Sequence, residues 1–459
     1  MAEIKSFKGL RYTEKAGAIA QLCCPPYDII DKATRERFLQ HNPHNIIRLE
    51  LPKPLSDTTP DDQPYALAAQ ILKDWLSKGL VKAALEECLY VYEMEFQLAG
   101  SPEFHSVKGF ISLVKLEEFS KGIILPHEET LSKAKTDRLK LMEATGCNFS
   151  QIYSLYMDEN AQILELITAQ SLNAPDSEFT DGDNVTHRLW CVSDSKFIEK
   201  VTTLMADKKI YIADGHHRYE TALNYRNNLA NRGVSMGASE YVPMMLVNIE
   251  NPGLVVFPTH RIVRGLANFD YAACLEKCAE FFDVTQDIPP KMALAALEQA
   301  YRDEKKAFLI YTKDSYTLIV LKEGVSVGDS PSTEAQDKSA SELLQIKQTC
   351  SRFATGGSPD SPVERLDVSV LHTLVLDRIL GIDKENMTNQ TNLVYTKTIA
   401  EALAAVDSAN ANCAFLLNPT RISEIRDVAA NGEKMPQKST YFYPKLTTGL
   451  VFRQLTVDS

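Results

Sequence analysis

The chain has 459 residues, too many for one hydrophobic core, so its length predicts two or three domains. Hydrophobic residues make up 44% and charged residues 24% of it, as in an ordinary globular protein. The formal net charge of −12 argues against broad, charge-driven binding of nucleic acid, which needs a basic surface. It leaves room for a small anionic ligand held in one local basic pocket.

Neither a membrane span nor a secretory leader is expected. No stretch reaches the roughly eighteen uninterrupted apolar residues of a membrane helix. The start, Met-Ala-Glu-Ile-Lys-Ser-Phe, lacks the apolar core of a signal peptide. Nine cysteines without metal-type spacing indicate reduced thiols. These features predict a cytoplasmic protein without membrane partners, and they leave its oligomeric state open.

Residues 1–189 are predicted to form an α+β region that packs on a central core. Pro25-Pro26 fixes φ twice and predicts an extended turn that presents Tyr27 and Asp28. The sequence then predicts a helix at 64–78 and a two-stranded hairpin, 89–98 with 107–116, around a Gly/Pro turn. A second helix is predicted at 136–144.

The predicted core spans residues 190–267. A short strand at 208–213 runs into Asp-Gly-His-His-Arg-Tyr-Glu (214–220), and an apolar stripe at helical spacing follows. A hairpin of 241–249 with 254–257 is expected next, ending in Pro-Thr-His-Arg at 258–261.

The remaining chain is divided into a second α+β module, 268–395, and a strand-helix segment, 396–459, that returns to the core. Ser361, proline and Glu364 at N-cap, N1 and N3 predict the start of a helix reaching Leu380. A polar loop is expected at 328–341. The other elements expected here are helices at 274–282, 289–301 and 422–430 and strands at 307–311, 317–321 and 413–417.

The adjacent histidines His216 and His217 are a poor pair of metal ligands. Neighbouring side chains point apart in a strand and diverge by about 100° in a helix, whereas residues four apart converge on one ion. We therefore expect no zinc and no redox cofactor. Magnesium needs few protein ligands, so an ion held by Asp214 and a ligand phosphate stays open.

The same stretch fits a turn that holds an anion. Gly215 lies where a strand ends and a helix begins, and the amides that follow it have no partners inside the helix. Those amides lie at the positive end of the helix dipole, a geometry that suits phosphate. Arg218 adds a planar fork for bidentate contact. The alternative is an ordinary helix start with solvated polar residues.

Residues in and near this turn are the candidates for acid–base catalysis. The candidates for catalysis are Asp214, His216, His217, Glu220 and Glu128. The candidates for binding phosphate or nucleotide are Gly215, Arg218, His260, Arg261, Lys438, Ser439 and Tyr441. The candidates for contacting a substrate are Tyr27, Asp28, His127 and Arg138.

The box Asp-Gly-His-His-Arg-Tyr-Glu-Thr-Ala (214–222) resembles the ParB/sulfiredoxin-like superfamily, and most closely its free-serine kinases. Over nearly its whole length the chain also resembles a long bacterial and archaeal family of unassigned function, often labelled ParB/Spo0J-like. The motifs that carry this second resemblance are Pro-Pro-Tyr-Asp (25–28), Asn-Pro-His-Asn-Ile-Ile-Arg-Leu (42–49), Pro-His-Glu-Glu-Thr (126–130), Asp-Arg-Leu (137–139), Pro-Thr-His-Arg (258–261), Leu-Asn-Pro-Thr (417–420) and Met-Pro-Gln-Lys-Ser-Thr-Tyr-Phe-Tyr-Pro-Lys-Leu (435–446).

The resemblance implies an α+β fold with a ParB/sulfiredoxin-like core and large additions before and after it. It implies that the Asp214–Arg218 turn holds phosphate of a nucleotide or phosphorylated metabolite. The leading expectation is therefore phosphoryl transfer on a small hydroxyl compound, serine or phosphoserine by analogy, in the direction of a kinase or a phosphatase. The alternatives are a nucleotide-binding switch or scaffold without turnover and, least favoured by the charge, a ParB-like nucleic-acid-associated protein.

Overall fold

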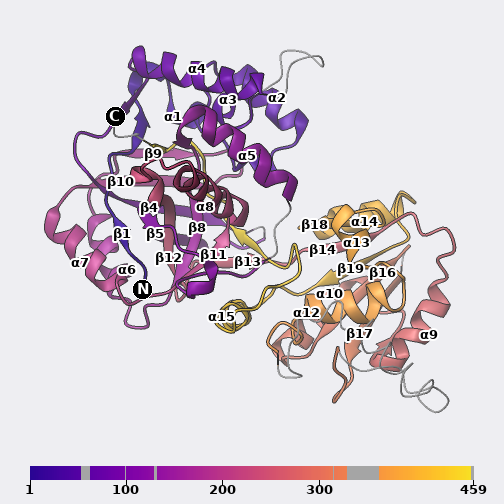
Figure 1. Ribbon diagram of the computed structural model, residues 1–459. Coiled ribbons are helices and arrows are strands. Elements are labelled where there is room, and N and C mark those ends of the chain that lie inside the picture. The colour runs from indigo at the N-terminus through magenta and orange to yellow at the C-terminus, as the bar shows by residue number, and fades with distance from the viewer. Residues whose placement is uncertain (53–61, 99, 129–131, 314, 328–360, 456–459) are drawn as a thin grey trace. The chain divides into compact units, whose positions relative to one another are not determined.

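The computed structural model describes residues 1–52, 62–98, 100–128, 132–313, 315–327 and 361–455 (Figure 1). The loop expected at 328–341 lies outside these residues. The chain divides into two compact units. The first contains residues 1–126, 130–255 and 442–459, and the second contains residues 127–129 and 256–441.

A nine-stranded mixed sheet organises the first unit. Its strand order is β6-β11-β8-β12-β5-β4-β10-β9, and β1 also pairs with β5. The predicted hairpin is confirmed as β4 and β5, which pair antiparallel along their length. The strands are β1 (Ile4–Lys5), β4 (Leu89–Gln97), β5 (Phe104–Lys115), β6 (Ile124–Pro126), β8 (Ile152–Tyr156), β9 (Ser177–Thr180), β10 (Thr186–Val192), β11 (Ile210–Asp214) and β12 (Tyr241–Asn248).

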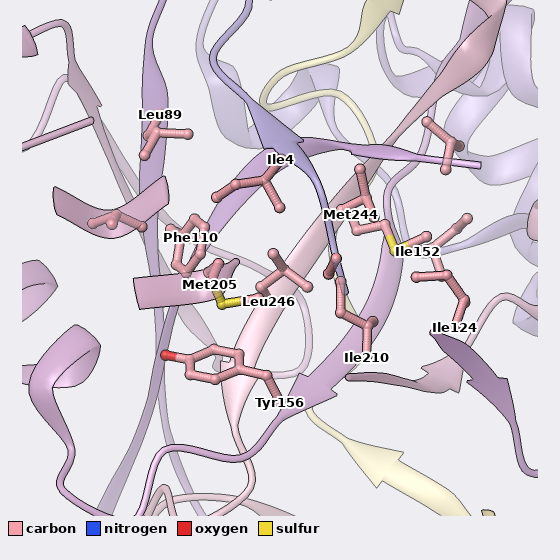
Figure 2. Close-up of a cluster of buried hydrophobic side chains, with 14 of the residues drawn as sticks. Ile4, Leu89, Phe110, Ile124, Ile152, Tyr156, Met205, Ile210, Met244 and Leu246 are labelled. Carbon is pink, nitrogen blue, oxygen red and sulfur yellow. The ribbon is translucent and has the colours of Figure 1, made fainter. Parts of the chain in front are cut away.

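One face of this sheet carries the main hydrophobic core. Strand residues alternate between faces, so Ile152 and Tyr156 of β8 point into the core together with Met244 and Leu246 of β12 (Figure 2). Helices α6 (Gln162–Gln170), α7 (Ser195–Met205) and α8 (His216–Asn231) supply apolar residues to this core.

The opposite face is rich in tyrosine. It carries Tyr90 and Tyr92 of β4 and Tyr153 of β8, all buried. The C-terminal segment, residues 442–455, contacts this face, because the rings of Phe442 and Tyr153 lie 6.0 Å apart. We call this face of the sheet the tyrosine face.

A second hydrophobic cluster of the first unit surrounds buried Trp75, Ile46 and Phe452. It is built by helices α1 (Ile19–Leu22), α2 (Lys32–His41), α3 (Ile47–Glu50), α4 (Gln63–Ser77) and α5 (Ser132–Thr145) and by the strand pairs β2 (Leu10–Tyr12) with β3 (Val81–Ala83) and β7 (Cys147–Asn148) with β21 (Arg453–Gln454). Short 3₁₀ helices cover Glu14–Ala16, Tyr27–Ile29, Phe119–Lys121 and Gly237–Glu240.

The second unit contains a six-stranded sheet of order β15-β17-β16-β19-β14-β18. Its strands are β14 (His260–Val263), β15 (Phe282–Thr285), β16 (Ala307–Thr312), β17 (Ser315–Leu321), β18 (Leu393–Thr396) and β19 (Cys413–Leu417). Its helices are α9 (Tyr271–Phe281), α10 (Pro290–Arg302), α12 (Asp367–Val370), a π-helix (Leu371–Asp377), α13 (Lys384–Asn389), α14 (Ile399–Asp407) and α15 (Ile422–Ala430). Helices α10 and α14 pack on the sheet through a shared apolar core.

Two expectations about local structure are wrong. The hairpin of 241–249 with 254–257 does not form. All eight residues of β12 are buried, which suits a central strand, and β12 pairs with β5 and β8. Instead, β13 (Val255–Phe257) pairs with β20 (Tyr441–Tyr443).

The helix expected to start after Ser361 begins at Asp367. Leu366 is extended there, and the Val363 amide donates to Glu433 (3.2 Å) rather than to the predicted cap.

The division into segments also differs from the expected one. Residues 190–255 belong to the same unit as residues 1–126, because β4, β5 and β10 share one sheet with β11 and β12. Strand pairing between distant segments, rather than chain order, defines the unit. None of the helices in the described ranges is both long and apolar enough to cross a bilayer.

Candidate functional site

A β-bulge directs Asp214 onto the tyrosine face. The pairing of β11 with β8 is regular up to Ile212, which lies opposite Ser154, and then shifts so that Asp214 lies opposite Tyr153. Residues directly opposite each other share a face, so Asp214 points away from the hydrophobic core. In a regular ladder Ala213 would lie opposite Tyr153, and Asp214 would lie opposite Ile152 and point into that core. Such bulges often re-aim a side chain next to a functional site.

Gly215 makes the turn from β11 into α8, as predicted. Its φ of 96° lies in the left-handed region, where a side chain is strained. Its missing side chain also leaves room for Arg218, because an added Cβ would lie 2.9–3.0 Å from guanidinium atoms. The first turn of a 16-residue helix follows at once, so amide donors and the positive end of the dipole meet here.

Two cations hold Asp214, one at each oxygen of its carboxylate. Arg218 Nη2 lies 2.8 Å from Oδ2 and Lys445 Nζ lies 2.9 Å from Oδ1. Arg218 Nη1 also donates to the carbonyl of Gln151. Although burial raises the pKa of Asp214, Lys445 and Arg218 outweigh it and hold that pKa well below the usual range. Asp214 is therefore ionised at neutral pH and weakly basic, and the three side chains carry a net charge of +1.

We call Asp214, Arg218 and Lys445 the Asp214 triad. The other polar residues of the turn differ in their burial and in their partners. His216 is buried and close enough to Asp214 to help lower the pKa of that carboxyl, whereas His217 is partly exposed. Glu220 lies one turn further along and forms an ion pair with Lys135 (2.7 Å). Glu220 is therefore held by its own cation, separately from the Asp214 triad.

The predicted substrate-contacting residues of the first unit lie near Arg218. The Arg138 guanidinium lies 4.3 Å from the centre of the Tyr27 ring and donates to the Glu50 carbonyl (2.7 Å). Burial raises the pKa of Tyr27 to about 12, while the nearby Arg218 charge opposes that rise. Asp28 is exposed and contributes to raising the pKa of Arg218. The structure thus brings Tyr27, Asp28 and Arg138 together with the turn.

Magnesium at Asp214 does not fit the arrangement. Both carboxylate oxygens already accept from cations within 2.9 Å, and a divalent ion would have to share them. Over the described part of the chain, no group of three or more His, Cys, Asp or Glu side chains is placed to hold a metal ion.

The remaining predicted residues belong to the second unit. The Lys438 amide donates to Glu128, and His127 Nε2 lies 3.0 Å from Thr440 Oγ1. Arg261 is completely buried, with its bonds to neutral partners: His372 Nε2 (3.2 Å) and the carbonyls of Thr259 and Lys438.

This buried group does not resemble a phosphate site. Burial lowers the pKa of His260 to about 4, and its Nδ1 accepts the Leu417 amide (3.2 Å). His260 is thus neutral, and no surface of Arg261 is open to a ligand in this structure. Ser439 is buried, with its carbonyl accepting from Thr420 (3.0 Å), and Tyr441 accepts from Lys397 (3.3 Å).

Lys445 is the site residue that sequence reasoning did not select. It lies 231 positions after its partner Asp214, so no local spacing connects the two. The available signal was the motif at 435–446, in which Lys445 follows a proline near the end of the chain.

The fold and site define an α+β protein with a cationic turn on the face of a mixed sheet. The chain belongs to the family described as "Protein of unknown function (DUF1015)", whose model matches residues 4–369. The match is to this family and not to a ParB or Spo0J family, so the ParB label stays a prediction. No curated protein matches the chain.

Several solved structures match at low identity. A free serine kinase mutant in complex with AMP shares 13% identity, with 73% of this chain and 90% of that chain covered and a TM-score of 0.35. SbnI with a C-terminal truncation, from Staphylococcus aureus, shares 11%, covering 76% and 90%, with a TM-score of 0.35. A conserved hypothetical protein from Pyrococcus furiosus shares 14%, covering 72% and 92%, with a TM-score of 0.32. At these values none of the matches bears on the activity of this chain.

Gly215→Ala is expected to destabilise the first unit more than Gly233→Ala does. Both glycines have positive φ, which costs an alanine about 1–2 kcal/mol, but nothing lies within 4 Å of a Cβ added at Gly233. The difference between the variants therefore reports the Arg218 contact. Urea unfolding followed by tryptophan fluorescence measures it, because both tryptophans, Trp75 and Trp190, lie in the first unit. Equal destabilisation by the two variants would show that Arg218 does not need the space.

Proposed function

We propose that the first unit holds the phosphate of a nucleotide or other phosphorylated metabolite at the Asp214–Arg218 turn. The reaction we assign to it is phosphoryl transfer to or from a small hydroxyl compound of the serine class. The resemblance of residues 214–222 to the free-serine kinases supports the reaction class, as does the ParB/sulfiredoxin-like core that the same box predicts.

The observation that carries the proposal is the placement of Lys445. Lys445 adds a second cation to the carboxylate that Arg218 holds, so two cationic groups meet at the start of α8 in a chain whose formal charge is −12. Cationic side chains that converge on one point can form charge-assisted hydrogen bonds to a phosphate. Phosphate also suits the amides of the first turn of α8.

The geometry assigns roles within this proposal. Phosphoryl transfer depends mainly on positioning and on neutralising charge at the transferring group. Arg218 and Lys445 supply the charge, and Asp214 orients both cations. A carboxyl with so low a pKa is a weak base, so Asp214 is not the group that activates the hydroxyl. His216 and His217 remain candidates for contacting phosphate or moving a proton.

Lys445→Ala is expected to weaken binding of ADP by about 10- to 100-fold. The magnitude follows from about 1.5–3 kcal/mol for a hydrogen bond to a charged group, at about 1.4 kcal/mol per tenfold. Isothermal titration calorimetry measures the affinity. The matched control is Lys121→Ala, which removes a half-exposed lysine paired with Glu117 in the same unit and should leave affinity within about twofold.

Two results would count against the proposal. If Lys445→Ala binds ADP as tightly as the unchanged protein does, phosphate is not held at the triad. If the unchanged protein binds ADP but forms no product from ATP and serine, or from phosphoserine, the nucleotide-binding switch is favoured instead.

A further inference from the structure

A cavity of about 320 Å³ lies in the second unit beside helix α9. Asp270 at the N-cap of α9 lines it together with Ala273, Cys274 and Lys277 of the helix, and this i, i+3, i+4, i+7 spacing marks one helix face. The loop before α9 and the turn after the π-helix supply the other walls, which are mostly apolar: Leu266, Ala267, Asn268, Phe269, Ile379 and Leu380. A thiol and an ammonium group thus share one wall of a largely apolar cavity.

The two charged side chains of this wall differ in their partners. Asp270 Oδ1 caps α9 by accepting the amides of Ala272 (3.0 Å) and Ala273 (3.2 Å). Lys277 is exposed, and its ammonium has no hydrogen-bond or ion-pair partner among the described residues. Residues three apart are neighbours on a helix surface, so this ammonium is available to a ligand that reaches Cys274.

Cys274 belongs to a group of three thiols, and the other two are closed off. Cys278 lies one helical turn further along α9, Cys413 lies on β19, and both are completely buried. Neither lines the cavity. A buried thiol is ordinarily a small apolar filler, which explains Cys278 and Cys413. It does not explain a thiol at the cavity wall beside a lysine.

The surroundings of Cys274 favour its thiolate. The Cys278 thiol hydrogen-bonds to it and, together with the Lys277 ammonium, lowers the pKa of Cys274 although burial opposes this effect. In each of the other described cysteines the pKa is raised, in Cys278 mainly by its bond to Cys274 and elsewhere mainly by burial. The thiolate is the nucleophile in cysteine chemistry, so reactivity is expected at Cys274.

A disulfide between Cys274 and Cys278 does not suit this geometry. Side chains four residues apart on a helix have Cβ atoms about 5–6 Å apart, whereas a disulfide needs about 3.5–4.5 Å. The two sulfurs can therefore form a hydrogen bond, but a covalent bond between them would distort α9. A sulfur that bonds to Cys274 has to come from a molecule in the cavity.

We propose that Cys274 is a modification site that forms a mixed disulfide with a low-molecular-weight disulfide carrying carboxylate groups. The apolar walls contact the body of the small molecule, and Lys277 pairs with a carboxylate. All residues of this site belong to the second unit, and the inference goes beyond the proposed function without depending on it.

The reaction is a thiol–disulfide exchange. The Cys274 thiolate attacks one sulfur of the small disulfide, a bond forms between these two sulfurs, and the original sulfur–sulfur bond breaks. The departing thiolate takes the bonding electron pair, so Cys274 is oxidised and the departing sulfur is reduced. Cys278 is a positioning residue, because its S–H stabilises the attacking thiolate from outside the cavity.

The test compares two small disulfides on the folded, full-length protein. Oxidised glutathione carries carboxylates, whereas cystamine carries only amino groups, and mass spectrometry of peptides identifies the cysteines that each one modifies. Cys274 should react with oxidised glutathione at least about 10-fold faster than Cys278 or Cys413, since each unit of pKa changes the thiolate fraction up to about tenfold. In urea all three should react. Absence of the mixed disulfide at Cys274 in the folded protein, or equal rates at the three cysteines, overturns the proposal.

Lys277→Gln tests the ligand class. Removing a charge about 4 Å from a carboxylate in water costs about 1 kcal/mol, so the ratio of the glutathione rate to the cystamine rate should fall about fivefold. The ratio cancels any change in the thiolate fraction of Cys274. Lys291→Gln, at an exposed lysine on α10 of the same unit, is the matched control and should leave the ratio unchanged. Equal ratios in Lys277→Gln and the control overturn the assignment of a carboxylate.

The role of Cys278 is read from the pH dependence of alkylation of Cys274 by iodoacetamide. The midpoint should lie below about pH 8.5, the value of an ordinary cysteine. It should move upward in Cys278→Ala, which removes the hydrogen bond, and return in Cys278→Ser, which keeps a donor. A structural role for Cys278 would leave the midpoint in place. A midpoint at or above about pH 8.5 in the unchanged protein contradicts an activated thiol.

Discussion

Arg218→Ala should destabilise the first unit by about 3–5 kcal/mol and abolish measurable nucleotide binding. The guanidinium is buried and bonded to Asp214 and to the carbonyl of Gln151, so its loss leaves a largely buried carboxylate with Lys445 as its remaining cation in the triad. Urea unfolding followed by the fluorescence of Trp75 and Trp190 measures the loss, since both report on the first unit.

The stability of Arg218→Ala at acid pH supplies an independent check. In the native protein the depressed pKa of Asp214 contributes stability that is present above about pH 4 and lost as pH falls towards the folded pKa. Without Arg218 that pKa rises towards the unfolded value, so the acid loss of stability should still begin near about pH 4 but end at a higher pH and be smaller. Arg226 lies on the same helix and donates to Glu118 and to the Leu116 carbonyl, so Arg226→Ala should leave the loss of stability at acid pH unchanged. The same loss of stability at acid pH in Arg218→Ala and in the unchanged protein would contradict the effect of Arg218 on the pKa of Asp214.

Asp367→Asn should stabilise the second unit at pH 7 by up to about 3 kcal/mol. Burial raises the pKa of Asp367 to about 6 from 3.8, although Lys306, 3.1 Å away, opposes the rise. Glu424 shares the same lysine (2.7 Å), so one cation serves two carboxylates. A raised carboxyl pKa means that the folded state binds more protons between about pH 4 and 6. Stability is therefore present below pH 4 and lost as pH rises through 6, at about 1.4 kcal/mol for each pH unit that separates the folded and unfolded pKa values.

This effect is measured by far-ultraviolet circular dichroism in urea at pH 4 to 7, because the second unit contains no tryptophan in the sequence. The unchanged protein should lose stability over this range, and Asp367→Asn should lose much less. Asp407→Asn is a suitable control, since that carboxyl lies in the same unit and accepts from Tyr311 (2.6 Å). A flat profile for the unchanged protein would show that Asp367 titrates normally.

The sequence predicted the turn well because the turn is local. Gly215 at a strand-to-helix junction is recognisable from the residues on either side of it, and the helix starts at His216 as expected. The hairpin of β4 with β5 is also local, with its strands joined by a short Gly/Pro turn. In both cases the determining contacts join residues close together in the chain.

What could not be predicted depends on distant contacts. The bulge that turns Asp214 towards Tyr153 arises from pairing with β8, which lies far earlier in the chain. Lys445 reaches Asp214 from the end of the chain, and Tyr92 meets His187 across 95 positions. The helix start predicted at Ser361 rested on a local capping signal. In the structure the Val363 amide donates to Glu433 instead, and the helix begins at Asp367. No periodicity in the sequence encodes these pairings.

The most direct test of the phosphate site is a crystal structure of the protein grown with ADP. We expect a phosphate group within hydrogen-bonding distance of Lys445 Nζ, of the Arg218 guanidinium and of the amides that follow Gly215. Nucleotide bound elsewhere in the chain, with the Asp214 triad free of phosphate, would contradict this assignment.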